Sequence, residues 1–305
     1  MPRTSILFTC FNHLDYLPAA WDSVWAQTDQ DFELIALDDG STDGTREWLT
    51  AQAQNLDPAR VKVIFNERNL GTYATLNVGL EAAGGEFVCV FNDDDLWAPA
   101  KLAKQVAAMS EPKVGLVHVS GWFIDAKGER HADPAPLGFP WPRTGSGDQL
   151  AALIDHNQII TSSVMARRAC FEKGGFDPAF YGCGDWQMWL CIAQDWNVAY
   201  VDEPLCFYRV HGTNAARNTT KMDDDSWRIR EWITTWEGEM DPKRPGVTDA
   251  FTHNWACLGT ERALRGDLAG ARQAYGTAIR RRPARLKTWA RYAGTFFPSV
   301  ARRWR

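Results

Sequence analysis

The chain has 305 residues, of which 45% are hydrophobic and 23% are charged, and 15 of them are tryptophans. This composition provides enough apolar surface for a large core and excludes an intrinsically disordered protein. The net charge of −5 conceals an asymmetry, because residues 268–305 carry +10 without any acidic side chain, and the rest of the chain carries −15. Since that remainder is strongly acidic, we do not expect the basic segment to bind nucleic acid.

The sequence predicts neither a membrane span nor a disulfide framework. No apolar run approaches the roughly 20 residues that cross a bilayer. The opening segment MPRTSILFTCFNH enters a strand pattern without the apolar core of a signal peptide. The seven cysteines form no CxxC pair and lie mostly among apolar neighbours, as buried reduced thiols do. We therefore expect a cytoplasmic protein without a zinc site.

Short apolar runs alternate with helical patterns in the first half of the chain. The patterns predict strands at 5–9, 32–38, 61–65, 86–91 and 114–119, separated by helices near 15–27, 43–54, 72–83 and 99–109. This alternation predicts an α/β fold with a mainly parallel sheet and helices on both faces. Ligands of such sheets bind at the carboxyl ends of the strands. The polar segments TCFN, DDGSTDGT and NDDDLW each follow a predicted strand, so we expect them to meet.

The segment DDGSTDGT has a structural and a functional interpretation. Gly40 would supply a turn between strand and helix, and Thr42 or Asp43 would cap the helix that follows. A turn needs only one of the two acids, Asp38 and Asp39. The other acid would lie at the mouth of the sheet, where a carboxylate can accept a hydrogen bond from a nucleobase or a ribose.

The segment NDDDLWAP places three carboxylates next to one another at a strand end. Capping of the next helix by Asp94 or Asp95 would use only one of them. Adjacent carboxylates repel one another, and a bound cation offsets that repulsion. Mg²⁺ and Mn²⁺ take oxygen ligands and are commonly held by one or two carboxylates together with the phosphates of a substrate. The triplet therefore predicts a site for one of these two ions.

The order SILFTCFNHLDYL, FELIALDDGSTDGT, NLGTYATLNVGLEAAGGEFVCVFNDDDLWAP resembles the nucleotide-sugar-binding half of a family 2 glycosyltransferase with the GT-A fold. The resemblance covers roughly residues 4–120. It implies a mixed, mainly parallel sheet, and a nucleoside-diphosphate sugar as donor, with UDP or dTDP favoured. It also implies a divalent metal bridging the acids and the donor diphosphate, with Asp94 as the best ligand and Asp95 as a second ligand.

The same resemblance implies which side chains contact the donor. Thr9 and Phe11 would line the base pocket, and Asp39 would accept from a pyrimidine. Asn92 stands where many relatives carry an acid, so whether Asn92 or Asp93 faces the ribose stays open. The full set of expected donor-binding residues is Thr9, Phe11, Asn12, Asp38, Asp39, Asn77, Asn92 and Asp93.

Two further candidates lie in the second half. Asp185 begins a tryptophan-rich helical pattern after GGFDPAFYGCG, and spacing alone favours an N-cap as much as a catalytic role. The family resemblance implies that an acid at this helix start is the general base for the acceptor hydroxyl. His211, in YRVHGTN after the strand-like segment EPLCF, stands where relatives carry a histidine near the diphosphate, which implies a metal or phosphate ligand. A lone histidine is more often structural. The other five histidines show no comparable setting.

The C-terminal part is predicted to be helical. The segment NWACLGTERALRGDLAGARQAYGTAIRRRP has the pattern of one tetratricopeptide repeat, with Gly266 and Asp267 as the turn of a helical hairpin. Beyond it, Leu286, Trp289, Ala293 and Phe297 share one helical face among basic residues, and Phe296 and Trp304 add further aromatic surface. Such a segment suits an anionic membrane surface, but it suits the acidic body of the protein or a partner equally well.

The sequence therefore predicts a GT-A domain over residues 1–215, with a donor half at 1–120 and an acceptor half at 121–215, followed by a helical region at 216–305. We expect a metal-dependent, inverting transferase that moves a sugar to a hydroxyl of a glycan or lipid-linked acceptor in surface polysaccharide synthesis, on the inner face of the membrane or free in the cytoplasm.

Other functions fit the sequence less well. An interaction protein built on an inactive GT-A fold is the main alternative, and the intact set of Asp39, Asp94 and Asp185 argues against it. A sugar-nucleotide pyrophosphorylase should carry a glycine-rich loop after the first strand, and TCFNHLDYL contains no glycine. A nicotinamide dehydrogenase should show G-x-G-x-x-G after a strand, and this pattern is absent.

Overall fold

The computed structural model describes residues 2–54 and 56–297. Within them the chain divides into two compact units, which are described separately. The first unit holds the sheet and comprises residues up to 149 and residues 158–219; the second is helical and comprises residues 150–157 and the chain from residue 220 on.

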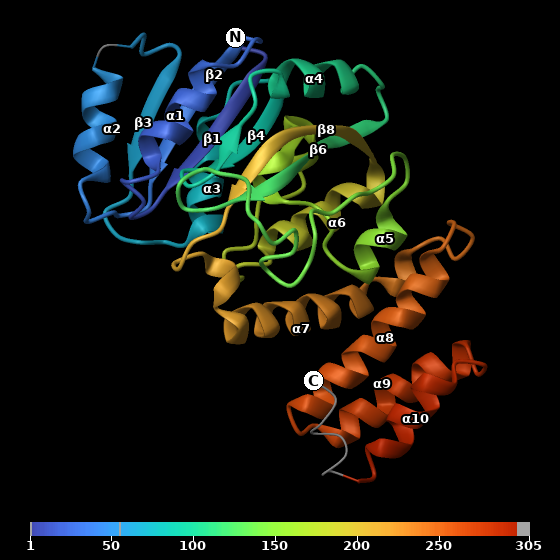
Figure 1. The fold of residues 1–305 in the computed structure, drawn as a ribbon. Helices are drawn as coiled ribbons and strands as arrows, with labels where there is room; N and C mark the ends of the chain where they lie inside the picture. The colour runs from blue at the N-terminus through green and yellow to red at the C-terminus, as the bar shows by residue number, and fades with distance from the viewer. Residues whose placement is uncertain (1, 55, 298–305) are drawn as a thin grey trace. The chain divides into compact units, whose positions relative to one another are not determined.

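The described part of the first unit contains one eight-stranded sheet in the order β3-β2-β1-β4-β7-β6-β8-β5. The pairs β3–β2, β2–β1, β1–β4 and β6–β8 are parallel, and β7 and β5 pair antiparallel with their neighbours. The mixed, mainly parallel sheet is thereby confirmed (Figure 1). Its strands are β1 (Thr4–Cys10), β2 (Phe32–Asp38), β3 (Val61–Phe65), β4 (Phe87–Asn92), β5 (Leu96–Trp97), β6 (Val114–Ile124), β7 (Val164–Arg167) and β8 (Asn197–Arg209).

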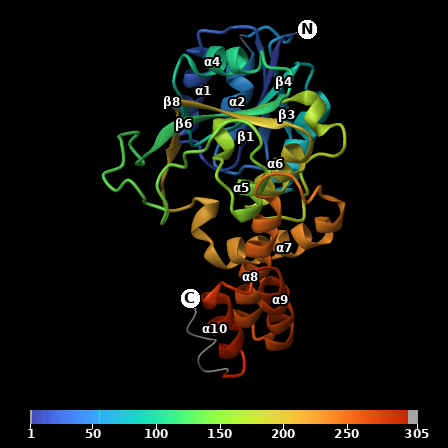
Figure 2. The ribbon, with the colours of Figure 1, turned by 90° about the vertical axis from the view of Figure 1, so that its right-hand side faces the viewer.

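Helices cover both faces of the sheet, as the apolar strand pattern predicts. Figure 2 shows α1, α2 and α4 on one side and α6 on the other. On the opposite face from α1, Gly79 of α3 lies so close to β1 and β2 that a Cβ there would come within 2.6 Å of Leu37. The helical segments of this unit are α1 (Leu17–Trp25), α2 (Thr45–Ala53), α3 (Thr72–Ala82), α4 (Lys101–Ala108), α6 (Gly184–Asp195), η1 (Thr161–Ser163), η2 (Arg168–Phe171) and η3 (Ala215–Arg217).

The carboxyl ends of several strands meet at one edge of the sheet. The strand register sets Thr9 opposite Asn92 and Cys10 opposite Asp38, so the segments that follow β1, β2 and β4 begin side by side. Because β7 is antiparallel to both β4 and β6, the strands β6 and β8 run in the same direction as β4. The end of β8 at Arg209 therefore reaches the same edge.

The second unit consists of packed helices. Between α8 and α9 the chain turns at Gly266, whose φ of +86° favours glycine, and the Asp267 carboxylate caps α9 by accepting from the Gly270 N–H at 2.8 Å. The relation of this helix pair to a tetratricopeptide repeat stays a prediction. The helical segments are α5 (Leu150–Asp155), α7 (Thr219–Thr235), η4 (Glu237–Glu239), α8 (Val247–Leu264), α9 (Leu268–Arg281) and α10 (Leu286–Gly294).

The amphipathic face predicted at the C-terminal end is exposed in this structure. Leu286 is 79% exposed, Trp289 46% and Phe297 63%, and Phe296 is exposed beside them. Trp304 lies outside the described residues. Among the helices that the structure describes, none combines the length and the apolar character that a bilayer crossing requires.

Candidate active site

The three adjacent acids after β4 each have different partners. Asp93 accepts from the backbone N–H of Phe11 at 2.9 Å and lies 2.8 Å from Nδ1 of His13. The Asp95 carboxylate accepts from the hydroxyl of Ser162 and, at 2.9 Å, from the backbone N–H of Arg209. Both acids are buried. None of the three caps α4, whose N-cap is Ala100.

Asp94, the expected metal ligand, lies against His211. Its Oδ2 is 2.9 Å from Nε2 of His211 and 3.4 Å from Nδ2 of Asn214. Asn214 holds the loop after β8 in place, since its amide donates to the carbonyl of Arg209 and accepts from the N–H of His211. The histidine expected near the diphosphate is therefore beside the acid expected to bind the metal, although 117 residues separate them.

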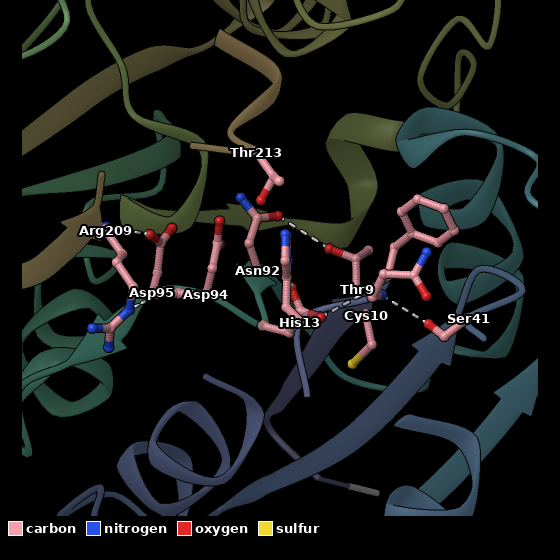
Figure 3. A network of polar contacts seen from close by, with 12 residues as sticks. Thr9, Cys10, His13, Ser41, Asn92, Asp94, Asp95, Arg209 and Thr213 are labelled. Atoms are coloured by element: carbon pink, nitrogen blue, oxygen red, sulfur yellow. Dashed lines mark hydrogen bonds and ion pairs between the residues drawn. The ribbon is translucent and has the colours of Figure 1, made fainter. Parts of the chain in front are cut away.

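His13 belongs to this cluster, and our sequence analysis missed it. One ligand atom each from His13, Asp94 and His211 lies within 4.8 Å of the others. The rings of His13 and His211 meet edge to face with centroids 5.0 Å apart. Figure 3 shows His13, Asn92 and Asp94 next to one another, with Thr213 beyond their ends. A usable signal was the position of His13 in the loop after the first strand, where the sheet rule places ligands.

The electrostatics of the cluster favour a cation. Burial raises the pKa of the Asp95 carboxyl well above its usual value, and the negative charge of Asp94 raises it further. Burial alone would lower the pKa of His13, but the hydrogen bond to Asp93 and the charges of Asp93 and Asp94 raise it to about 9. The negative charge of Asp94 therefore raises the proton affinity of both Asp95 and His13. A divalent cation beside Asp94 would supply the positive charge that these protons otherwise provide.

Thr9 and Asn92 are joined directly at the ends of β1 and β4. The Thr9 hydroxyl donates to Oδ1 of Asn92 at 3.1 Å. Phe11 is 40% exposed, so part of its apolar surface is open to solvent beside the sheet edge. Asn12 adopts φ = +56° and links this loop to the segment after β2, with its N–H donating to Ser41 Oγ and its Oδ1 accepting from the N–H of Thr42. The three polar segments thus meet as expected.

Asp39 organises the loop between β3 and α3. Its Oδ1 accepts from Nδ2 of Asn66 at 2.9 Å, from the Leu70 N–H at 2.8 Å and from the Thr75 hydroxyl at 2.8 Å, while its Oδ2 accepts from the Gly71 N–H at 3.0 Å. A carboxylate offers about four lone-pair sites, two on each oxygen. Oδ2 therefore retains capacity for one further donor.

Two other expected donor-binding residues also have protein partners. Asp38 is fully buried, accepts from the Ser41 N–H at 3.2 Å and pairs with Arg46 at 3.4 Å. The amide of Asn77 bonds the backbone of Phe176 in both directions, at 2.7 and 2.8 Å. These contacts fix the turn after β2 and the segment before α6, and a contact with the donor stays a prediction for both side chains.

Asp185 lies in the first turn of α6 and is not its N-cap, a position held by Cys183. Its Oδ2 accepts from the Thr161 hydroxyl at 2.6 Å, and its Oδ1 accepts from the Trp186 N–H at 2.6 Å. Burial raises the pKa of Tyr208 well above its usual value, and the charges of Asp94, Asp95 and Asp185 add to the effect. The charges of Asp185, Asp94 and Asp95 therefore all raise the pKa of Tyr208.

Comparison with known proteins identifies the family. Residues 5–174 match the model of Glycosyl transferase family 2. The chain belongs to that family. An uncharacterized glycosyltransferase of Nostoc sp. is 32% identical over 241 residues, covering 73% of this chain and 71% of the relative. By contrast, the chain spans only 35% of the length of the uncharacterized glycosyltransferases that it matches in Rickettsia felis and Rickettsia conorii.

Solved structures of other transferases share the fold of this family 2 member. TarS of S. aureus, residues 1–349 in complex with UDP-GlcNAc, matches with a TM-score of 0.69 at 16% identity, covering 98% of this chain and 87% of that one. A mannosyltransferase from Pyrobaculum calidifontis in complex with GDP-Man and Mn²⁺ matches with a TM-score of 0.64 at 18% identity, covering 98% and 86%. These likenesses establish the GT-A fold.

Proposed function

We propose that this glycosyltransferase moves a sugar, with inversion, from a nucleoside-diphosphate sugar to a hydroxyl of a glycan or lipid-linked acceptor. The observation that carries the proposal is the meeting of the Thr9–Asn92 pair with the Asp94–His211 pair at the carboxyl edge of the sheet. The structural neighbours support a nucleotide-sugar donor, because they hold UDP-GlcNAc or GDP-Man. UDP or dTDP is the donor nucleotide that we favour, and surface polysaccharide synthesis the pathway.

The side chains around Asp94 fit a divalent cation. A carboxylate and imidazole nitrogens lie close together among buried acids, which is a suitable donor set for Mn²⁺ and, for the carboxylate, Mg²⁺. Asp94 and His211 would hold the ion, and Asp95 would support Asp94 from its buried position. When bound, the ion would offset the charge of the donor diphosphate. Asp93 would orient His13 through their hydrogen bond.

The rest of the donor site follows from the contacts at the strand ends. Phe11 would stack its exposed ring on the base, with Thr9 and Asn12 shaping the pocket around it. The remaining acceptor capacity of Asp39 Oδ2 suits the N–H of a pyrimidine. Asn92, already bonded to Thr9, would face the ribose.

Asp185 would act as the general base. A sugar hydroxyl is a poor nucleophile, so a carboxylate must take its proton as the anomeric carbon is attacked. The hydrogen bonds from Thr161 and from the Trp186 N–H fix the orientation of the Asp185 carboxylate before the acceptor arrives.

Substitution of this base tests the assignment. Asp185→Asn should abolish transfer and leave the Kd for the nucleotide unchanged, because the amide keeps the size of the side chain but takes no proton. Asp177→Asn is a matched control from the same segment, since the Asp177 side chain accepts from the Ala179 N–H at 2.8 Å and an asparagine keeps that bond. Wild-type activity in Asp185→Asn would refute the role.

The donor is identified by thermal shift with UDP, dTDP, GDP and CMP in the presence of Mn²⁺ or Mg²⁺. A ligand that binds only the folded state raises its stability by mass action, so the correct nucleotide should give the largest shift. If a folded wild-type protein neither binds these nucleotides nor hydrolyses their sugars, the enzyme proposal fails, and an interaction protein on an inactive fold becomes the better explanation.

We also propose that residues 216–305 form a helical domain that binds anionic lipid and holds the GT-A domain of residues 1–215 at the inner face of the membrane. Leu286, Trp289, Phe296 and Phe297 expose apolar surface, and the surrounding segment carries only basic charges. Each Lys or Arg near an anionic surface contributes about 1 kcal/mol.

Vesicle co-sedimentation tests this surface. The full chain should pellet with anionic vesicles at low salt and be released as salt rises. The double variant Phe296→Ser, Phe297→Ser removes two rings that are more than half exposed, at the cost of the contacts of Phe296 with Tyr292 and Arg272, and should lose much of this binding while keeping nucleotide affinity. A full-length protein that stays in the supernatant would contradict the membrane proposal.

A further inference from the structure

The orientation of His13 is fixed by a buried acid. Nδ1 of His13 lies 2.8 Å from Oδ1 of Asp93, a residue only 3% exposed. An ionised carboxylate only accepts, so Nδ1 carries the proton in this bond and Nε2 is the nitrogen that remains for a ligand. Metal-binding histidines very often donate their second ring N–H to a carboxylate in this way, which orients the ring and strengthens it as a ligand.

His211 also has a partner on each ring nitrogen. Its Nδ1 lies 2.9 Å from the hydroxyl of Thr213, which can donate or accept, and its Nε2 lies 2.9 Å from Asp94 Oδ2. Two neighbouring ligand atoms on one ion are about 3 Å apart when each bond is near 2.1 Å. Within the described residues, His13, Asp94 and His211 are the one group of three histidine, cysteine or acidic side chains with ligand atoms within 4.8 Å of one another.

We propose that His13 is the third protein ligand of the divalent cation, and that the resulting two-histidine, one-carboxylate centre prefers Mn²⁺ or another first-row transition metal to Mg²⁺. The proposal rests on the proposed donor site, since the same ion would face the diphosphate. It adds a ligand from the loop after β1 to those from the ends of β4 and β8.

The metal preference follows from the ligand atoms. Mg²⁺ is a hard ion that prefers oxygen, whereas imidazole suits transition metals. The two acids next to Asp94 are committed elsewhere: Asp93 to Phe11 and His13, and Asp95 to Ser162 and Arg209. Asp94 thus supplies the carboxylate, and two nitrogens make up the rest of the protein ligands. The His13 side chain is 20% exposed while that of His211 is 4% exposed, so phosphate oxygens would enter on the His13 side.

A different role is open to a histidine at this position. His13 could contact the donor phosphates without touching the ion. Two substitutions separate the roles: in His13→Asn the short amide can keep the bond to Asp93 but offers nothing at the position of Nε2, whereas in His13→Gln the longer side chain can place an oxygen there. His156→Asn, at an exposed histidine of the second unit, is the control.

Mn²⁺ binding is measured without nucleotide, from the electron paramagnetic resonance signal of the free ion, with Mg²⁺ as competitor. His13→Asn should weaken Mn²⁺ binding about 10-fold or more, the scale seen when the support of a metal ligand is lost. His13→Gln should recover part of that affinity and reduce the preference for Mn²⁺ over Mg²⁺, because its ligand is oxygen. His156→Asn should match the wild type.

Pulsed electron paramagnetic resonance of bound Mn²⁺ tests the proposal on the wild type itself, because it detects the nitrogen atoms that coordinate the ion. The wild type should show coupling to two imidazole nitrogens, and His13→Asn to one. Coupling to a single imidazole in the wild type would overturn the proposal, as would a Kd for Mn²⁺ in His13→Asn within threefold of the wild-type value. Unchanged Mn²⁺ binding with weaker UDP binding would assign His13 to the phosphates instead. Failure of the wild type to bind any nucleotide sugar would refute the proposed function while leaving the Mn²⁺ result intact.

Discussion

Asp39 is the residue at which a structural and a donor-binding role can be separated most sharply. Its carboxylate accepts four hydrogen bonds, three at Oδ1 and one at Oδ2, and the residue is 5% exposed. In Asp39→Asn one oxygen becomes an NH₂ group, which can only donate. In either orientation of the amide, its NH₂ group faces at least one backbone N–H. The orientation that costs less free energy places the NH₂ group opposite the N–H of Gly71.

The magnitude follows from these contacts. Losing the bond to Gly71 leaves a partly buried N–H unpaired, and a hydrogen bond to a charged acceptor contributes roughly 1.5–3 kcal/mol. The three remaining bonds lose the charge of their acceptor, so we expect a destabilisation of about 3 kcal/mol in total. Asp38→Asn is the matched control, because Asp38 has two longer contacts, at 3.2 Å from the Ser41 N–H and at 3.4 Å from Arg46, whose side chain is 42% exposed.

Urea denaturation followed by tryptophan fluorescence measures both variants, and isothermal calorimetry well below the unfolding transition measures UDP and ADP binding. Asp39→Asn should be about 2 kcal/mol less stable than Asp38→Asn. If Asp39 also contacts a pyrimidine, folded Asp39→Asn should lose its preference for UDP over ADP. Equal stability of the two variants would refute the account of the loop, and an unchanged preference would refute the base contact.

Two further predictions follow from perturbed side chains. Burial lowers the pKa of His118 from 6.5 to about 3, so the folded state keeps this ring neutral and the unfolded state binds a proton below pH 6.5. Stability should therefore be complete above that pH and fall by about 2 kcal/mol by pH 5. The unfolding free energy of the wild type relative to His118→Gln should fall by this amount between pH 7.5 and 5, and a constant difference would contradict it. Iodoacetamide should label Cys257 before Cys89, as read by mass spectrometry. Burial opposes ionisation of Cys257, but a hydrogen bond to His253 and the charge of Arg230 lower the pKa of its thiol. Burial raises the pKa of the Cys89 thiol to about 11. Faster labelling of Cys89 would show that His253 and Arg230 do not activate Cys257.

The first half of the sheet was predictable because its strands are apolar runs, and those of β1, β2 and β4 are almost entirely buried. The predicted ranges 32–38 and 61–65 coincide with β2 and β3. The strand β8 was recognised only around EPLCF, because its residues alternate irregularly between buried and exposed and include Glu203 and Pro204. β5 has two residues and exists through pairing with Phe207 and Cys206, far along the chain. No local pattern encodes such a strand.

The chemistry of the site was predictable at the level of segments and not of partners. The three segments at the strand ends and the acid at the start of α6 were found from their residue types and their order. The different partners of the three consecutive acids could not be predicted, because they are distant in sequence. Asp93 contacts His13, 80 residues away, and Asp94 contacts His211, 117 residues away. The one usable signal for His13 was its position in the loop after the first strand, and its closeness to Asp94 and His211, together with the ring orientation set by Asp93, supports the proposed ligand role.

The ligands of the proposed centre all lie in the first unit, on three separate loops after β1, β4 and β8, and this has a measurable consequence. An ion that binds only when these loops are together stabilises the first unit by about 2.7 kcal/mol at a free concentration of 100 times its Kd. The second unit has its own core around Ala271 and Tyr275 and contributes no ligand. In hydrogen-exchange mass spectrometry, Mn²⁺ should therefore slow the most protected amides of β1 and β4 about 100-fold and leave those of α9 unchanged. Equal slowing in both units would show that they unfold as one, and no slowing in β1 or β4 would show that the ion does not join these loops.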